Sequence, residues 1–245
     1  MPYSNTRVIL NAGGPPSRYW ADHTGAPKHL VAVPTPNGGQ QPLLVRTIHQ
    51  LVSRGITDIR LICDCTDPRY NLDGVIRYDH IPATVGVQSL IHGSILWSTY
   101  GRTVSLMGDW FYTKDCLDRI LARGEAREWL HLARIGRSTV NGQPWSEDAG
   151  VSFWPEHHDA YLQAIHDIDA LSRAGAIPRA GAWEVWCRMA GLNGPEVHTM
   201  LDTPEVLTLG HRIVLPDDGS SDFDLPVYFD TWSTAVAEGW VSLAY

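Results

Sequence analysis

The sequence has few lysines, no long hydrophobic run and no cysteines at zinc-binding spacing. Only two of the 19 basic residues among the 245 of the chain are lysines, Lys28 and Lys114. The apolar runs are as short as Val8-Ile9-Leu10, whereas a membrane-spanning helix needs about 20 apolar residues. No basic stretch followed by an apolar segment opens the chain, so we expect neither a membrane span nor a signal peptide.

The four cysteines are Cys63, Cys65, Cys116 and Cys187, and none of them forms a CxxC pair. This spacing argues against a structural zinc site. Isolated cysteines of this kind are typical of a reducing compartment, so we expect a cytoplasmic protein.

Charge is unevenly distributed along the chain. The 27 acidic and 19 basic residues give a net charge of −8, yet residues 1–60 carry +4 and the rest of the chain carries −12. A general nucleic-acid coat would need a basic face over much of the surface, so nucleic acid is not the expected partner. The basic N-terminal segment suits a small anionic ligand instead.

Strand-like and helix-like segments alternate along the sequence. The expected strands span 6–11, 57–63, 75–79, 103–107, 129–135, 150–154 and 212–215. The expected helices span 41–54, 87–97, 115–123, 157–174, 181–190 and 231–239. The Pro- and Gly-rich stretch 13–42 is expected to be irregular. Such alternation predicts an α/β fold, Rossmann-like, with a mostly parallel sheet and helices on both faces.

The length favours one domain. The sequence leaves a homo-oligomer open.

Three segments are expected at the carboxyl ends of strands, where ligands bind in a parallel α/β sheet. They are Gly13 to Lys28, Gly86 to Ser89 and Gly108-Asp109. A glycine pair lets the backbone approach a phosphate, and Arg18 and Lys28 supply donors for phosphate oxygens. Asp109 is a hard oxygen ligand of the kind that Mg²⁺ prefers.

Residues 12–18 (Ala-Gly-Gly-Pro-Pro-Ser-Arg) and 27–30 (Pro-Lys-His-Leu) resemble a known family signature. It is the Gly-Gly-x-Gly-(Thr/Ser)-Arg, Pro-Lys-x-Leu pattern of sugar-1-phosphate nucleotidyltransferases and of relatives that transfer a nucleotide to molybdopterin. Residues 86–90 resemble the family's nucleotide-binding turn, and 106–109 its metal-binding Gly-Asp. Residues 222–226 (Asp-Phe-Asp-Leu-Pro) resemble its late Asp-x-Asp-x-Pro segment.

The resemblance implies the GT-A-type fold of nucleotide-diphospho-sugar transferases and a Mg²⁺-dependent transfer of NMP from an NTP to a phosphorylated, sugar-like acceptor. Residues 1–113 would then form a nucleotide-binding half and residues 114–245 an acceptor-binding half. The implied catalytic residues are Arg18, Lys28 and Asp109. The implied nucleotide contacts are Ala12, Gly13, Gly14, Ser17, Gln88 and Ser89. The implied metal ligands are Asp109, Asp222 and Asp224. On the acceptor side we expect Glu147 at a sugar hydroxyl, together with Trp110. Trp20 and Trp110 both adjoin the expected site in the sequence and are candidates to stack on a base or a sugar ring.

Two other functions stay open at this point. A glycosyltransferase using a nucleotide sugar would need the same metal and diphosphate handling. The second is a nucleotide- or sugar-binding module without catalysis. It stays open because Pro16 stands where the family has a glycine, and a proline removes one backbone N–H donor from the loop. Ordinary structural roles are also open, with Asp109 as a helix N-cap and Asp222 and Asp224 in a solvated acidic loop.

Overall fold

The computed structural model describes residues 3, 5–13, 18–79, 87–122, 127–199, 210–223 and 225–245. The strands of its main sheet are β1 (Thr6–Asn11), β4 (Asp58–Cys63), β5 (Ile76–Asp79), β6 (Arg102–Met107), β8 (Leu130–Arg134), β9 (Glu147–Phe153) and β10 (Arg212–Leu215). Two small sheets pair β2 (Ala32–Pro34) with β3 (Gln40–Pro42), and β7 (Trp110–Phe111) with β11 (Ser221–Asp222).

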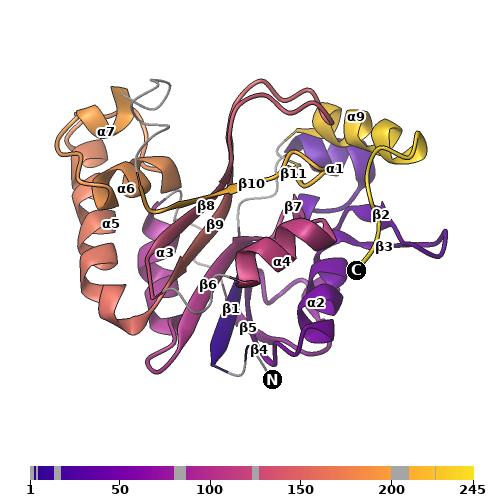
Figure 1. Ribbon diagram of the computed structural model, residues 1–245, viewed down its shortest axis with the longest axis horizontal. Coiled ribbons are helices and arrows are strands. Elements are labelled where there is room, and N and C mark those ends of the chain that lie inside the picture. Colours follow the sequence, from indigo (N-terminus) through magenta and orange to yellow (C-terminus); the bar gives the residue numbers. More distant parts are fainter. Residues whose placement is uncertain are drawn as a thin grey trace.

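Helices lie on both faces of the main sheet (Figure 1). They are α1 (Arg18–Thr24), α2 (Leu43–Ser53), α3 (Val87–Gly93), α4 (Lys114–Ala122), α5 (His158–Arg173), α6 (Ala182–Met189), α7 (Glu196–Thr199) and α9 (Pro226–Ala237). Short 3₁₀ turns occupy Lys28–Leu30, Pro68–Tyr70, Ser94–Leu96 and Pro155–His157. Among the described residues, no helix has the length and apolar character needed to span a membrane.

The strand order of the main sheet is β10-β8-β9-β6-β1-β4-β5. Strand β9 runs antiparallel to both β8 and β6, and the other neighbouring pairs are parallel. The prediction of a mostly parallel α/β sheet is therefore confirmed.

Three local predictions were wrong. The stretch 13–42 is not wholly irregular, because it contains α1, a 3₁₀ turn and the β2–β3 hairpin. The helix expected over 87–97 changes to a 3₁₀ turn after Gly93. Helix α9 begins at Pro226 rather than near residue 231, since a proline suits the first helical position, where its missing N–H is not needed.

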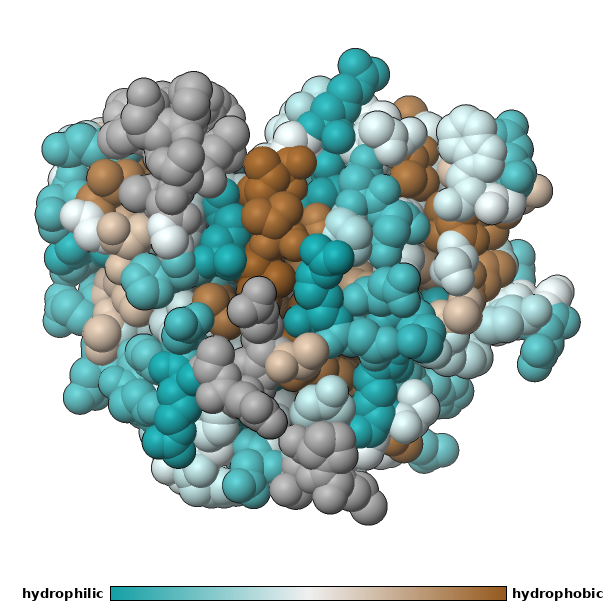
Figure 2. All heavy atoms as spheres, viewed as in Figure 1, coloured by the Kyte–Doolittle hydropathy of each residue, from teal (hydrophilic) through white to brown (hydrophobic). Residues whose placement is uncertain are grey.

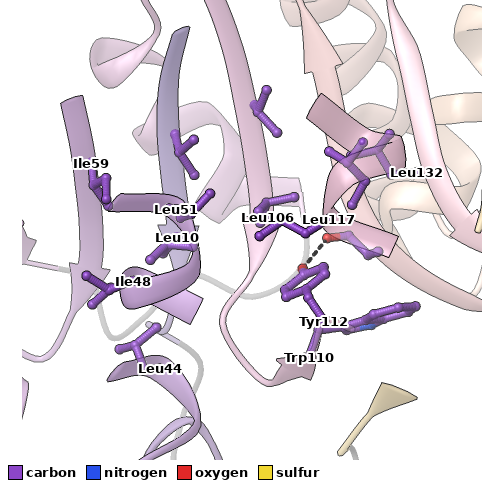
Figure 3. Packing of buried hydrophobic residues seen from close by; sticks show 14 of the residues in the cluster. Leu10, Leu44, Ile48, Leu51, Ile59, Leu106, Trp110, Tyr112, Leu117 and Leu132 are labelled. Carbon is purple, nitrogen blue, oxygen red and sulfur yellow. Dashed lines mark hydrogen bonds between the residues drawn. The ribbon is translucent and has the colours of Figure 1, made fainter. Parts of the chain in front are cut away.

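The two faces of the sheet form separate parts of the core. One face packs on α2 and α4, and Figure 3 shows leucines and isoleucines of these helices meeting those of β1, β4, β6 and β8. The other face packs on α3, α5 and α6. A third, smaller cluster joins α1, β2, β7 and α9 around Trp232. The sheet is thus fixed from both sides, which holds its carboxyl edge in place for a site.

Gly150 is required where β9 pairs with the end of β6. Its φ is +148°, and a Cβ there would lie 2.0 Å from the carbonyl oxygen of Ser105. We expect Gly150→Ala to lower the free energy of unfolding by about 3 kcal/mol, through backbone strain and overpacking. Gly210→Ala is the control, because a Cβ at Gly210 meets no described atom within 4 Å. Denaturant unfolding of both variants checks this, and equal stability of the two would contradict it.

Candidate active site

The carboxyl ends of β1 and β6 lie side by side, with Asn11 paired to Met107. Directly beyond them, the Gly108 N–H donates to the Asn11 carbonyl at 2.8 Å. A Cβ on Gly108 would lie 2.7 Å from that same oxygen. Only glycine therefore fits this close approach without a shift of the backbone. The glycine of the Gly-Asp motif fixes where Asp109 leaves the sheet.

Asp109 forms an ion pair with Lys28, between Asp109 Oδ2 and Lys28 Nζ. Lys28 begins the 3₁₀ turn that follows Pro27, and its side chain is 20% exposed, against 11% for Asp109. Burial acts to raise the pKa of Asp109. The charges of Lys28 and His29 and the hydrogen bond from Lys28 outweigh this effect, so the pKa lies below its ordinary value. The structure thus joins two of the predicted catalytic residues and keeps the carboxylate ionised.

The segment of Asp222 lies alongside Asp109. Strand β11 pairs antiparallel with β7, which places Asp222 opposite Trp110. The Phe223 N–H donates to the Asp109 carbonyl at 3.2 Å. Two of the predicted metal-ligand positions are therefore neighbours in the fold, while Asp224 lies outside the described residues.

The donor set suits a hard cation that takes part of its coordination from substrate. Within the described ranges, no group of three or more His, Cys, Asp or Glu side chains could hold a metal ion. Mg²⁺ does not need such a cage, since it commonly binds one or two carboxylates together with water and substrate phosphates.

His29 belongs to the surroundings of Asp109 and contacts Tyr70, and neither residue was predicted from the sequence. His29 is buried and its Nδ1 lies 3.2 Å from the Tyr70 hydroxyl. The charge of His29 contributes to the lowered pKa of Asp109. His29 fills the variable position of the Pro-Lys-x-Leu pattern, and Tyr70 comes from a 3₁₀ turn after β4. Neither position carried a signal in the sequence.

The predicted nucleotide loop is described only at its two ends. Ala12 is buried and its N–H donates to the Ile62 carbonyl at 2.8 Å, so that amide is already used by the sheet. Gly13 follows it, and Arg18 opens α1. Gly14 and Ser17 lie outside the described residues. Gln88 and Ser89 stand in the first turn of α3, and their side chains, like that of Arg18, also lie outside the described part.

Neither tryptophan predicted to stack on a ligand is available for it. Trp110 is 0% exposed and stacks on Tyr112, with ring centroids 5.6 Å apart. Figure 3 shows the two rings next to each other. Trp20 is 1% exposed and packs edge-on against Phe229. Both predictions were wrong because these indoles fill core positions.

Glu147 stands at the same edge of the sheet, but its carboxylate does not face a ligand. The side chain is fully buried, and Arg134 Nε donates to its Oε2 at 2.9 Å. Burial raises the pKa of Glu147 above its ordinary value, and Arg134 offsets only part of that rise. Arg134 also donates to the carbonyls of Gly136 and Trp145. The expected contact with a sugar hydroxyl is therefore replaced by a buried ion pair that closes the β8–β9 loop.

Breaking this pair from one side should be costly. We expect Glu147→Met to lower the free energy of unfolding by about 3–5 kcal/mol, because it leaves the Arg134 charge buried without its partner. The double variant Arg134→Met/Glu147→Met should lose clearly less than the sum of the two single variants. Urea denaturation of the three proteins measures the coupling, and strict additivity would show that the pair does not act as a unit.

The acidic run before β11 is anchored rather than simply solvated. Asp217 accepts from Ser138 Oγ at 2.9 Å and from the Thr139 N–H at 2.6 Å. Asp218 accepts from the Thr113 hydroxyl at 2.5 Å. These contacts tie the segment before Asp222 to the β8–β9 loop and to the residues after β7.

An open groove lies between α1 and the start of α9. It is lined by Asp22, His23, Leu225, Pro226 and Val227. On the face of the molecule drawn in Figure 2, apolar side chains gather near the middle of the upper edge. The lining of the groove includes neither Lys28 nor Asp109, so it is not the site that these two residues build.

Comparison with solved structures defines the class of fold. The chain is similar to CTP:phosphocholine cytidylyltransferase from Streptococcus pneumoniae, with 16% identity, a TM-score of 0.56, and coverage of 95% of this chain and 99% of that one. It is also similar to a candidate glucose-1-phosphate thymidylyltransferase from Bacillus anthracis, solved with a sucrose, with 13% identity, a TM-score of 0.53 and 98% coverage of each chain.

A third similar structure is Rv0371c from Mycobacterium tuberculosis H37Rv, with 15% identity, a TM-score of 0.55, and coverage of 94% of this chain and 97% of that one. No family model matches the sequence, and no curated protein matches it. The chain therefore has the Rossmann-like α/β fold found in nucleotidyltransferases, as its N-terminal signature predicts.

Proposed function

We propose that this protein is a Mg²⁺-dependent nucleotidyltransferase, which transfers NMP from an NTP to a phosphorylated acceptor and releases pyrophosphate. The observation that carries the proposal is the ion pair of Lys28 with Asp109 at the carboxyl ends of β1 and β6. This is the edge at which an α/β sheet binds its ligands. The fold supports the proposal, because the first two similar structures carry the names of a cytidylyltransferase and a thymidylyltransferase.

The reaction needs a phosphate oxygen of the acceptor to attack the α-phosphorus in line. The new P–O bond forms as the bond to the leaving pyrophosphate breaks. Little covalent work falls to the protein, so the rate depends on positioning and on neutralising negative charge. In this structure the Lys28 ammonium is neutralised by Asp109. The phosphates of a bound substrate would compete with Asp109 for that ammonium group.

Asp109 and Asp222 are the residues that would hold the metal, with Asp224 proposed as a further ligand. Bound Mg²⁺ would neutralise charge on the phosphates during transfer. Arg18, at the start of α1, is proposed to hold the leaving pyrophosphate through its fork of donors. Gly13 and Gly14 are proposed to let the backbone approach the nucleotide, and Gln88 to contact its base.

The acceptor is proposed to be a phosphomonoester of a sugar or a small alcohol. The names of the similar structures include phosphocholine and glucose-1-phosphate, which share that chemical group. The acceptor half from residue 114 onward would recognise the rest of the molecule.

A panel assay tests the proposal. The protein is incubated with Mg²⁺, each of the four NTPs and dTTP, and a set of sugar and alcohol phosphates, and pyrophosphate release is followed by a coupled assay. Release that needs both an NTP and one acceptor supports the function. No release with any pair from folded protein would refute it, and turnover of UDP- or GDP-sugars in its place would identify a glycosyltransferase.

A further inference from the structure

Arg212 lies on the sheet face covered by α6, with its charged group buried. It is the first residue of β10 and pairs in register with His131 of β8. Its guanidinium carbon lies 3.4 Å from the Trp186 ring centroid and 4.9 Å from that of Trp183. Its three guanidinium nitrogens are buried, and none of them has a hydrogen-bond partner in the part of the chain that the structure describes.

This arrangement differs from that of two other buried arginines in the described part of the chain. Arg102 donates from Nε to Ser152 Oγ at 2.7 Å and from its other two nitrogens to helix carbonyls. Arg46 leaves two nitrogens without a described partner, but its third donates to the Ala244 carbonyl at 3.0 Å. A buried donor without an acceptor costs free energy, most of all when it is charged. Arg212 is therefore a buried charged group whose three nitrogen donors lack, within the described ranges, an acceptor that would offset this cost.

Asp148 is the carboxylate that raises the pKa of Arg212, and it already contacts His131. Burial lowers the pKa of Arg212 to about 10, against raising effects of Cys187 and Asp148, so the group is still protonated at neutral pH. The contact of Asp148 Oδ1 is with His131 Nε2. His131 also stacks on Trp186, and its Nδ1 is buried with no partner among the described residues. The Arg212 charge thus lies within the influence of the Asp148 carboxylate, but none of its three nitrogen donors has an acceptor among the described residues.

We propose that the Arg212 cluster (His131, Asp148, Trp183, Trp186 and Arg212) is a binding site for a phosphate or carboxylate group. A guanidinium offers parallel N–H donors that match two oxygens of such a group. The two indoles contact the guanidinium and exclude water, and in such surroundings a charge-assisted hydrogen bond is stronger than in water. The site is separate from Lys28 and Asp109, and it does not depend on the proposed function.

Calorimetric titration of Lys28→Ala protein with inorganic phosphate, and separately with acetate, tests this site. The Lys28→Ala background weakens phosphate binding at the proposed active site. We expect saturable binding of one of the two anions, weakened at least tenfold by adding Arg212→Met. Arg212→Lys keeps the positive charge but loses the parallel N–H donors of the guanidinium. Its affinity for the anion should lie between that of the Lys28→Ala protein and that of the protein with Arg212→Met added. Arg46→Met is the matched control and should leave binding unchanged.

Thermal unfolding gives a second signature that a merely structural arginine would not produce. In anion-free buffer Arg212→Met should unfold at the same temperature as the wild type or higher, because it removes a buried charge without a partner. Saturating anion should raise the melting temperature of the wild type and not that of the variant. No binding of either anion to folded protein, or the same binding and thermal shift in Arg212→Met, would overturn the proposal.

Steady-state kinetics decide whether the bound phosphate or carboxylate group belongs to the acceptor or to a free anion. If it belongs to the acceptor of the proposed transferase, Arg212→Met should raise the acceptor KM at least tenfold with kcat unchanged. If it is a free anion, both constants should stay at their wild-type values. This arm alone rests on the proposed function, so a protein without transferase activity would still show the calorimetric result.

Discussion

Replacing Asp109 by asparagine is expected to lower kcat/KM for nucleotidyl transfer by about 10³-fold, since charge placed against the transferring phosphate is among the largest contributions to such catalysis. The amide keeps the size of the carboxylate but loses the negative charge that now pairs with Lys28. It would also be a poor ligand for Mg²⁺, so the concentration of Mg²⁺ at half-maximal rate should rise. Steady-state kinetics against NTP and Mg²⁺ measure both effects.

Asp118→Asn is the matched control for this substitution. Asp118 also pairs with basic side chains, Arg54 and Lys114, but it lies on α4 with 43% of its side chain exposed. Its loss should change the rate by less than about twofold, since exposed ion pairs contribute little. Wild-type activity in Asp109→Asn, with unchanged Mg²⁺ dependence, would remove Asp109 from the site.

Lys28→Ala is expected to lower the rate of transfer by a factor of about 10² or more, because it removes a positive charge from the phosphates in the transition state. The chain provides its own control, because Lys114 is the only other lysine. Lys114 pairs with Asp118 on the exposed side of α4, and Lys114→Ala should retain activity. Circular dichroism of both variants separates loss of catalysis from loss of fold.

The same pair of variants can contradict the account. Activity of Lys28→Ala within about twofold of wild type would mean that the ammonium makes no contact in the transition state. An equal loss in Lys28→Ala and Lys114→Ala would point to a general effect of charge rather than to a site.

The strands of the main sheet were largely predictable from the sequence, because buried strands leave continuous apolar runs. Strands β1 and β10 were predicted to the residue, and β4, β5 and β6 within one residue at their first positions. The β2–β3 hairpin was missed, since its three-residue strands are too short and too polar to show a pattern. Within the described sheet, β9 alone breaks the parallel order, and no alternation of helix and strand can indicate that.

Two of the proposed site residues carry a motif in the sequence. Lys28 was chosen from the Pro-Lys-x-Leu pattern and Asp109 from the Gly-Asp at the end of a strand, and the fold brings the two side chains into an ion pair. Their catalytic roles stay predictions. Trp110 and Glu147 were wrong as ligand contacts, because sequence alone does not show which side of a strand end faces the core. His29 was missed for a similar reason, since its effect on Asp109 comes from a buried position in the fold.

The destination of the α-phosphorus tests the central claim most directly. The protein is incubated with the NTP and acceptor that release pyrophosphate, the NTP being labelled with ³²P in the α position. Nucleotidyl transfer predicts that the label passes to a product joined to the acceptor, in amounts equal to the pyrophosphate formed, and that it stays on the NTP in Asp109→Asn. Label that appears only in free NMP or NDP, or an acceptor product without label, would contradict the account.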